Sequence, residues 1–516
     1  MAIALWLALP GHSSSRAAGV TIITHGLNSN IDDWVLAMAR AMAVYPRFPG
    51  ARFTCYEIYF TAVDSTYVPA WRRLGGDAPA ETDSGELLIK LDWRQLANDD
   101  YSTVDVAAMV VPPLLQTNFI SELNGHALAE LPLHLIGHSR GGSLVAQMSR
   151  LLGTNGVWVD QLTTLDPHPL NNDDFNDFPY TVVDAGVRTY ENVLFHDNYY
   201  QTLNLVFNGE PVAGAYVREL TSLDGGYGGV SASHSDVHLW YHGTIDWRIP
   251  ADDSVATLGN DERQSWWTQA EDLGASAGFY YSRMGGGDRL ATNRPAGAGT
   301  SRVRAGYNQR WDLGAGVADN RASLPAPRGD WPNLIRVNLA GPTFMAQGQS
   351  NDITLDYQWA GPTANNATVQ LYLDDDFNPH NGNERLLHEF LAAGTTATNV
   401  GQVTVNFRVA LTNSLPGDHA LFARISAAGY VRYLYAPERL AVFSSSDAPR
   451  LGLMLEPGGQ VRLDVTGRAG QRVVLESTGD FQSWQPFATN WLTTDQWSDI
   501  GQAVVGDRRF YRGVLR

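Results

Sequence analysis

Cysteine, lysine and charged residues as a whole are scarce in this 516-residue chain. Cys55 is the single cysteine, which excludes an intramolecular disulfide bond and any metal site built from several thiolates. Lys90 is the single lysine, so nearly all of the 36 basic residues are arginines. The 54 acidic residues outnumber them and give a formal net charge of -18, which would repel nucleic acid. We therefore expect no nucleic-acid partner.

The chain also lacks long hydrophobic runs. No segment holds about 18 uninterrupted apolar residues, so we expect no transmembrane segment. Residues 1–18 contain a short apolar run and then small residues that end in Ala17-Ala18, which resembles the end of a secretory signal. The positive segment that usually precedes such a run is missing. On this basis we interpret 1–18 as a candidate signal segment and expect a secreted or cell-surface protein.

Hydrophobic residues make up 44% of the chain, enough for large buried cores. From Val20 to about Arg321, short apolar runs typical of strands alternate with helical or loop material. This alternation predicts the α/β class over 19–320, with a mostly parallel sheet and helices on both faces. Ligands bind at the carboxyl ends of the strands in such sheets. The expected strands are VTIITHG, RFTCYEIYF, LLIKLDW, LPLHLIGHS, VWVDQLTTLD and NVLFHDNYY.

The pattern changes in the second half of the chain. Residues 321–332 are rich in proline and lack periodicity, which is typical of a linker. Seven short strand-like runs follow within 333–445 and predict an immunoglobulin-like β-sandwich. A second break, SSSDAPR, precedes 446–516, for which we predict a small all-β module.

An apolar run ends in Gly137-His138-Ser139-Arg140-Gly141, and a helical pattern follows at once. This matches the nucleophile-elbow pattern Gly-x-Ser-x-Gly in its required context, with a strand before it and a helix after it. The serine in such a corner has a strained backbone, and side chains in place of the glycines would collide with the neighbouring strand and helix. The pattern predicts that Ser139 is a catalytic nucleophile.

Acyl transfer also needs N–H donors for the negative charge that develops on the carbonyl oxygen. The backbone N–H of Arg140, directly after the serine and at the start of a helix, is one candidate. The second is the N–H of Leu27, which follows His25-Gly26 at the end of an earlier strand. We expect Leu27 and Arg140 to form the oxyanion hole.

A catalytic serine further needs a base and an acid that orients the base. In a sheet of this kind they follow in the order serine, acid, histidine. Asp166 ends a strand and precedes Pro167, which makes it the preferred acid, and Asp197 at the end of the next strand is the rival.

Three histidines at four-residue spacing, His234, His238 and His242, follow in SASHSDVHLWYHGTID. Ser235 is interpreted as the N-cap of a helix, which places His234 in the loop just before that helix, free to reach the strand ends. We therefore predict His234 as the base and interpret the other two as packing or surface histidines rather than metal ligands.

The motifs HG, GHSRGG, TLDPHP and HSDVHLWY together resemble the α/β-hydrolase superfamily, and more closely its lipase branch, whose acid lies in a Leu-Asp-Pro turn. The resemblance covers about residues 20–290. It implies an α/β-hydrolase fold and a serine esterase in which the histidine before the Trp-Tyr helix is the base. The end of the chain, with Trp484 and Phe510-Tyr511-Arg512, resembles a module at the ends of exported proteins of Verrucomicrobia-type bacteria, which implies a bacterial, exported protein.

These observations predict a secreted lipase or carboxylesterase that acts on a small-molecule or lipid ester through a Ser139-His234-Asp166 triad and an acyl-enzyme, with no required cofactor and no catalytic metal. The alternative left open is a catalytically inactive hydrolase-fold protein that binds a surface, with the β domains making surface or polysaccharide contacts.

Two further features are left with alternatives. Asp374, Asp376 and Asn378 stand at alternate positions in a turn, as calcium ligands do, or else form an acidic, solvated hairpin. The segment 61–86 is long and rich in turn residues, and is either a lid or a plain surface insertion.

Overall fold

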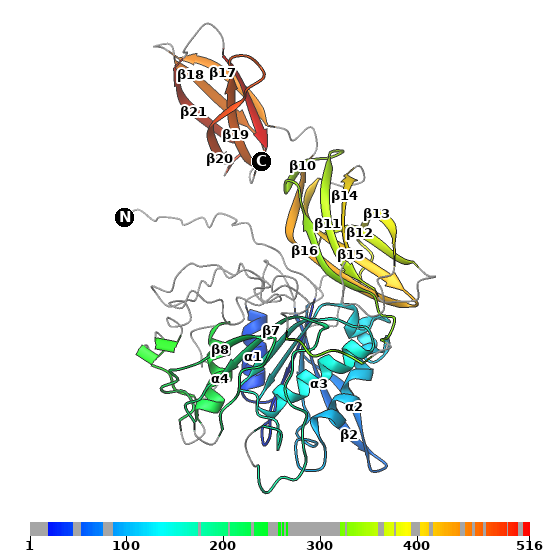
Figure 1. Ribbon diagram of the computed structural model, residues 1–516. Coiled ribbons are helices and arrows are strands. Elements are labelled where there is room, and N and C mark those ends of the chain that lie inside the picture. The colour runs from blue at the N-terminus through cyan, green and yellow to red at the C-terminus, as the bar shows by residue number, and fades with distance from the viewer. Residues whose placement is uncertain are drawn as a thin grey trace.

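The computed structural model describes most of the chain in three parts (Figure 1). The described residues are 19–44, 53–75, 86–173, 177–204, 207–228, 232–245, 256–259, 261–262, 265–266, 320–325, 328–359, 366–375, 378–393, 403–411, 416–443, 449–456, 460–467, 471–492, 494–503 and 509–515. The candidate signal segment 1–18 lies outside them, and so does part of the predicted linker. Export therefore stays a prediction.

The first part is built on an eight-stranded sheet in the order β3-β2-β4-β1-β5-β6-β7-β8. All neighbours pair in parallel except β2 and β3, which form an antiparallel hairpin at one edge. The strands are β1 (Val20–Thr24), β2 (Phe53–Val63), β3 (Thr66–Gly75), β4 (Glu86–Leu91), β5 (Leu133–His138), β6 (Val159–Leu165), β7 (Val193–Tyr200) and β8 (Tyr216–Glu219). Parallel pairing brings the carboxyl ends of β1, β5 and β6 to one edge of the sheet.

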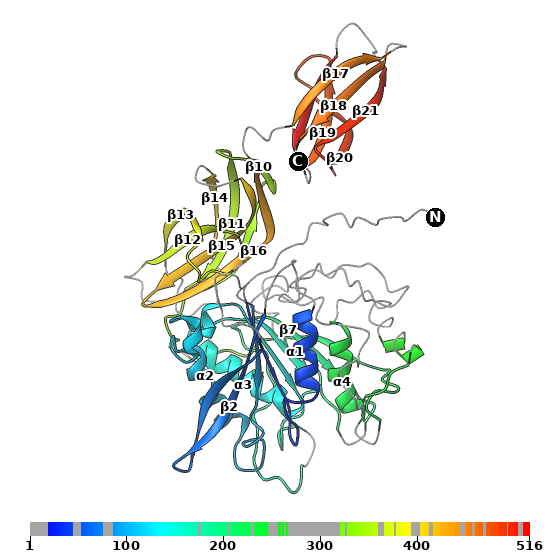
Figure 2. The same cartoon turned by 180° about the vertical axis from the view of Figure 1, so that it is seen from behind.

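Four α-helices lie against this sheet: α1 (Trp34–Val44), α2 (Thr103–Leu115), α3 (Arg140–Thr154) and α4 (Ala232–Gly243). Helices α1 and α4 share an apolar cluster with Ile23 and Ile136, whereas α2 and α3 share another with Ile22 and Leu135. Adjacent residues of one strand thus pack against helices on opposite faces of the sheet, as the two-residue period of a strand requires. Figures 1 and 2 show the two helix pairs from opposite sides.

The predicted fold class is wrong for this chain. The structure is mostly β, with 45% strand against 17% helix and four α-helices in the described residues, and it holds no helix-rich α/β-hydrolase core. One cause lies within the first part: the described residues of the connection 166–192 between β6 and β7 form turns and irregular chain rather than a helix. Side chains such as Asn171 and Asp184 satisfy its backbone groups. Strands also predominate in the described residues after 332, where β structure was predicted.

The second part, here called the sandwich, has a five-stranded sheet in the order β10-β16-β15-β12-β13 and a three-stranded sheet β14-β11-β9. Its strands are β9 (Asn333–Leu339), β10 (Phe344–Ala346), β11 (Ser350–Gln358), β12 (Ala367–Asp374), β13 (Arg385–Ala392), β14 (Val403–Ala410), β15 (Gly417–Ala427) and β16 (Tyr430–Phe443). Inward side chains of both sheets form one apolar core. Along β12, buried residues alternate with partly buried ones, which places these side chains.

The third part is a small module of two three-stranded sheets, β17-β18-β21 and β20-β19-β22. Its strands are β17 (Arg450–Glu456), β18 (Gln460–Thr466), β19 (Arg472–Thr478), β20 (Gln485–Trp491), β21 (Gln496–Ala503) and β22 (Phe510–Leu515). It has an apolar core of its own around Leu463 and Leu475.

The sandwich packs directly against the first part, as Figures 1 and 2 both show. Trp331, Phe422 and Tyr433 belong to the same apolar cluster as residues of the large sheet and of α2. The Trp158 indole N–H donates to Gln358 Oε1 across the boundary at 2.9 Å. The apolar core is therefore continuous between the two parts.

A buried ion pair adds to this interface. Arg432 on β16 and Asp160 on β6 are each 1% exposed, with Arg432 Nη2 2.6 Å from Asp160 Oδ2. The guanidinium also donates to the backbone carbonyls of Ala129 and Trp158 at 2.9 and 2.8 Å. Asp160 accepts a further hydrogen bond from the Leu133 N–H at 2.9 Å. Both charges are thus fully surrounded by partners, which is what burial of an ion pair demands.

Replacing Arg432 with alanine leaves the Asp160 carboxylate buried without its cation. We expect Arg432→Ala to lower the free energy of unfolding by about 3–5 kcal/mol. Urea-induced unfolding followed by tryptophan fluorescence measures this change. Arg408→Ala is the matched control, because Arg408 pairs with Asp352 on the sandwich surface with side chains 68% and 52% exposed. Equal effects of the two substitutions would contradict the assignment.

Candidate active site

Ser139 lies at a sharp corner between β5 and α3. Its backbone angles are φ 56° and ψ -129°, outside the regions that non-glycine residues favour. A Cβ atom on Gly137 would lie 2.1 Å from the Gly141 carbonyl oxygen, and one on Gly141 would lie 2.5 Å from the carbonyl oxygen of His25. The sequence-based reason for the glycines is therefore confirmed: the chain before the serine meets the helix, and the helix meets the end of β1.

The turn after β1 lies against the serine. A Cβ atom on Gly26 would lie 2.7 Å from Ser139 Cβ and 3.1 Å from Ser139 Oγ, so only glycine permits this approach. Leu27 follows in the same turn, and within the described residues its amide N–H donates to no protein acceptor. The amide of Arg140 is the first of α3, where N–H groups have no partner inside the helix. The turn that contains Leu27 and the start of α3 thus both adjoin Ser139.

Asp166 and His234 are in direct contact. His234 Nδ1 lies 2.7 Å from Asp166 Oδ2, and the aspartate side chain is fully buried. The carboxylate also accepts the backbone N–H groups of Gln201 and Gly209 at 2.9 and 3.0 Å and the Gln201 side-chain amide at 2.8 Å. These donors hold the carboxylate in one orientation toward the imidazole.

Asp197, the rival acid, points elsewhere. Its carboxylate accepts hydrogen bonds from Thr163, Gln161 and Tyr199 at 2.5, 3.2 and 3.1 Å. Burial raises the pKa of Asp197 to about 6. Of the two adjacent strand ends, only that of β6 supplies a carboxylate to His234.

His234 lies in the first turn of α4, because the helix begins at Ala232. The expectation of a loop position before a Ser235 cap is therefore wrong. The His234 carbonyl oxygen is 2.8 Å from His138 Nε2, and the two rings are 4.6 Å apart between centroids. His138 directly precedes Ser139, so this contact ties the helix to the elbow. Among the contacts of the described residues, none is a hydrogen bond between the Ser139 hydroxyl and His234; such bonds often form only with substrate bound.

The other two histidines of the series are packing residues, as predicted. His238 and His242 are each 4% exposed, and the His238 ring stacks on Trp34 with centroids 4.2 Å apart. Burial lowers the pKa of both His138 and His238 well below its usual range. These rings are therefore neutral at ordinary pH and add no positive charge beside His234.

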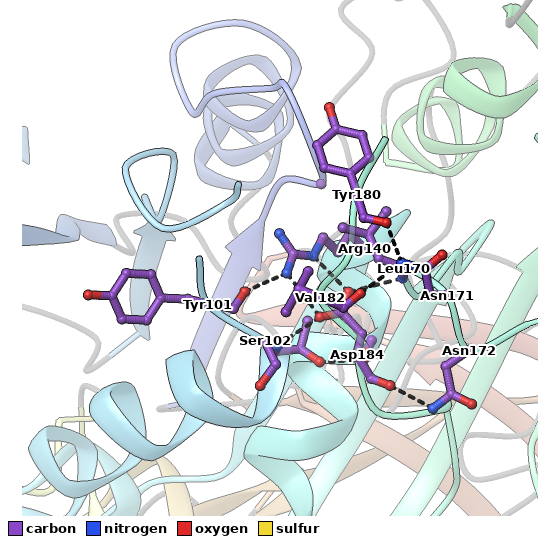
Figure 3. Close-up of polar contacts among 12 residues, drawn as sticks. Tyr101, Ser102, Arg140, Leu170, Asn171, Asn172, Tyr180, Val182 and Asp184 are labelled. Carbon is purple, nitrogen blue, oxygen red and sulfur yellow. Dashed lines mark hydrogen bonds and ion pairs between the residues drawn. The ribbon is translucent and has the colours of Figure 1, made fainter. Parts of the chain in front are cut away.

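The sequence did not reveal the role of the Arg140 side chain, which Figure 3 shows among its partners. The guanidinium is fully buried and forms two hydrogen bonds with Asp184, 2.7 Å from Nε and 3.0 Å from Nη2. It also donates to the carbonyls of Asn98 and Tyr101 at 2.9 and 2.6 Å. Its cationic carbon lies 5.1 Å from the centre of the Trp93 ring.

Asp184 extends this contact to the neighbouring loop. It accepts the N–H groups of Thr103, the first residue of α2, and of Leu170, in the turn after Asp166, at 2.8 and 3.0 Å. One ion pair therefore fixes the serine corner, α2 and the loop of the acid together. The only signal in the sequence was the arginine itself, directly after the serine at the start of a helix; its burial in the structure requires an anionic partner. Its partner, 44 residues further along the chain, cannot be read from local sequence.

The described residues include two of the three predicted calcium ligands. Asp374 is buried and accepts the Tyr435 hydroxyl at 2.5 Å, whereas Asp376 lies outside the described residues. Asn378 Oδ1 accepts the His380 backbone N–H at 3.0 Å. Calcium binding there stays a prediction. Two other groups in the described residues have metal-ligating atoms within 4.8 Å of one another: His126, Glu130 and His380; and His168, Asp173 and Asp177.

Most of the candidate lid is regular structure. Residues 61–75 belong to the β2–β3 hairpin at the sheet edge, where Phe60 pairs with Pro69 and Val63 with Thr66. Residues 76–85 lie outside the described residues. The hairpin part is thus a strand extension of the sheet.

Comparisons with known proteins add little. No family model matches the chain, and no curated protein matches it. The CARDB domain of a Pyrococcus furiosus protein in complex with di-metal ions is similar at 12% identity over 22% of this chain and 97% of that chain, with a TM-score of 0.15. The C-terminal domain of Wzt is similar at 13% identity over 22% of this chain and 75% of that chain, with a TM-score of 0.17. The human OSCAR ligand-binding domain is similar at 15% identity over 36% of this chain and 93% of that chain, with a TM-score of 0.16. Likenesses this weak carry no argument.

None of the described helices combines the length and the apolar character that crossing a bilayer requires.

Asp236 on α4, two residues after His234, predicts a pH dependence of stability. It is fully buried, it accepts the Tyr227 N–H at 2.9 Å, and burial raises its pKa to about 7. In the unfolded chain its pKa is about 3.9. Between about pH 4 and 7 the folded protein thus holds a proton that the unfolded chain has lost, so the free energy of unfolding falls as the pH rises through this range.

Asp236→Asn keeps a neutral side chain at all pH values and should make this fall smaller. Urea unfolding midpoints measured from pH 4 to 8 test the prediction, with Asp64→Asn in the exposed β2–β3 turn as the control. An unchanged pH profile in Asp236→Asn, matching that of the control, would show that Asp236 is ionised in the folded state.

Proposed function

We propose that this chain is a serine hydrolase of carboxylic esters. The observation that carries the proposal is the 2.7 Å contact between Asp166 and His234, two residues that sequence order alone assigned to one triad. Its second support is the strained corner that presents Ser139 beside the Gly26 turn. Fold class has no part in this proposal.

The contact between Asp166 and His234 determines which imidazole nitrogen of His234 carries the proton. With Nδ1–H donating to Asp166 Oδ2, Nε2 of His234 carries a lone pair and is the atom available as a base. Nε2 takes the proton of the Ser139 hydroxyl as Oγ attacks the ester carbon. The same proton then goes to the departing alkoxide, and an alcohol leaves. Water, deprotonated by the same nitrogen, then attacks the acyl carbon; the bond from that carbon to Ser139 Oγ breaks, His234 returns the proton to Oγ, and the acid leaves.

The oxyanion of the tetrahedral intermediate is assigned to the amides of Leu27 and Arg140. Both are backbone groups held by packing, so they need no reorganisation when the charge develops. The Arg140 side chain is a positioning element: its bonds to Asp184 and its contact with Trp93 hold the first turn of α3. Trp93 in turn donates its indole N–H to the His25 carbonyl at 2.9 Å, directly before the Gly26 turn.

We assign a lipase or carboxylesterase activity rather than an amidase, because no feature of the sequence argues for an activated amide leaving group. Export and contact with a surface or polysaccharide through the β modules belong to the same proposal. Initial rates on nitrophenyl esters of increasing chain length distinguish a lipase from a short-chain esterase.

Covalent labelling tests the nucleophile. A fluorophosphonate probe should label the wild-type protein at Ser139, and Ser139→Ala should abolish both labelling and ester hydrolysis. Ser143→Ala, on the same helix, is the matched control and should keep the label. A folded wild-type protein that takes no label would contradict the proposal and favour the surface-binding alternative.

Separate substitutions test the acid and the base. Asp166→Asn should lower kcat by about 10,000-fold, because it favours the wrong imidazole tautomer. Asp197→Asn, next along the sheet, should leave kcat nearly unchanged. His234→Ala should abolish turnover, and His238→Ala should retain it to the extent that the protein folds. Loss of turnover in His238→Ala alone, with the folded state verified by circular dichroism, would overturn the assignment of the base.

A further inference from the structure

We infer that the chain holds a site for one divalent transition-metal ion, with zinc as the best-fitting ion, between the first part and the sandwich, with His126, Glu130 and His380 as ligands. The site is separate from the proposed active site and does not rest on the proposed function.

The three side chains come from both sides of the interface. His126 and Glu130 stand at the short 3-10 turn Leu128–Glu130 that precedes β5. His380 belongs to the turn between β12 and β13 of the sandwich. One ligand atom from each residue lies within 4.8 Å of those from the other two. In a tetrahedral zinc site the ligand atoms are about 3.3 Å apart, so small side-chain movements suffice to close the set.

The donor set is one that zinc uses. Two imidazole nitrogens and one carboxylate oxygen leave a fourth position for water, and the intermediate softness of zinc suits imidazole. Calcium and magnesium prefer sets made of oxygen alone. The chemistry of the ligands therefore selects a transition metal over the calcium ion expected nearby in the same turn.

Glu130 is a buried carboxylate in need of a cation. It is 5% exposed, and its contacts are His126 Nδ1 at 2.7 Å and the Ala127 N–H at 3.1 Å. Among the described residues, no arginine or lysine forms an ion pair with it. A buried charge without such a partner is costly. A bound metal ion would supply the positive charge.

His380 offers a ligand atom to an ion. Its Nδ1 atom is buried and has no hydrogen-bond partner among the described residues. The His126 and His380 rings are stacked, with centroids 3.7 Å apart and planes at 16°. Coordination of one ion by both nitrogens requires one ring to tilt out of this stack.

Tyr433 closes one side of the site. Its ring meets the edges of both imidazoles, at 6.3 Å from His126 and 5.1 Å from His380 between centroids. Tyr433 lies next to Arg432 on β16, the residue that pairs with Asp160 across the same interface. A metal ion bound here would join the sandwich to the first part beside that ion pair.

Titration of the metal-free, full-length protein with Zn²⁺ alone tests the inference. Isothermal titration calorimetry should give binding of one ion per chain, and zinc should raise the midpoint of thermal unfolding. His380→Ala and Glu130→Gln should each weaken binding by at least about tenfold. His168→Ala is the matched control, because it disables the other group of candidate ligands, and should bind zinc as the wild type does.

X-ray absorption at the zinc edge of the loaded wild-type protein keeps the test decisive if a variant fails to fold. Two imidazole ligands support the site, whereas one imidazole indicates the group around His168 and overturns the inference. Absence of zinc binding to the wild type, or unchanged binding in a folded His380→Ala, also overturns it. None of these readouts depends on ester hydrolysis, so the result is independent of the proposed function.

Discussion

The contact between Asp166 and His234 is the interaction on which the rest of the site depends. It joins the end of β6 to the first turn of α4, two segments 68 residues apart in the chain. Asp166 has a left-handed backbone, with φ 43°, and its carboxylate is surrounded by donors from the loop after β7. Gly209 permits that approach, because a Cβ atom there would lie 2.5 Å from Asp166 Oδ1. The parallel register of β5, β6 and β7 is what brings these groups to one edge.

Close backbone packing and one buried ion pair give the serine corner its shape. Gly26, Gly137 and Gly141 have no room for a side chain, so the turn after β1, the end of β5 and the start of α3 lie in direct contact. The Arg140 side chain then connects the serine corner, through Asp184, to α2 and to the loop after Asp166. The amide of Arg140 is one of the two proposed oxyanion donors, and its side chain holds the surrounding loops. Close packing at the glycines and the ion pair of Arg140 with Asp184 together hold the serine corner in place.

Local sequence patterns predicted individual strands and turns, but they did not predict the proportion of strand to helix. The strands at VTIITHG and LPLHLIGHS and the corner at Ser139 rest on short-range patterns, and the pairing of Asp166 with His234 on the order serine, acid, histidine; the structure contains all of them. The α/β class was wrong, because the connection after β6 is held by side-chain hydrogen bonds that leave no periodic signal. The loop position of His234 was wrong because the helix begins at Ala232, before the Ser235 cap signal. Long-range pairs such as Arg432 with Asp160 have no local signature.

The proposed chemistry makes one central claim: Ser139, His234 and two backbone amides act on the same ester carbon. The most direct measurement is a crystal structure of the protein after reaction with a phosphonate ester. The account predicts phosphorus bonded to Ser139 Oγ, the phosphoryl oxygen within hydrogen-bond distance of the Leu27 and Arg140 amides, and His234 Nε2 facing Ser139 Oγ or the alkoxy oxygen that remains on phosphorus. A phosphonate attached to another residue, or an imidazole turned away from the adduct, would contradict it.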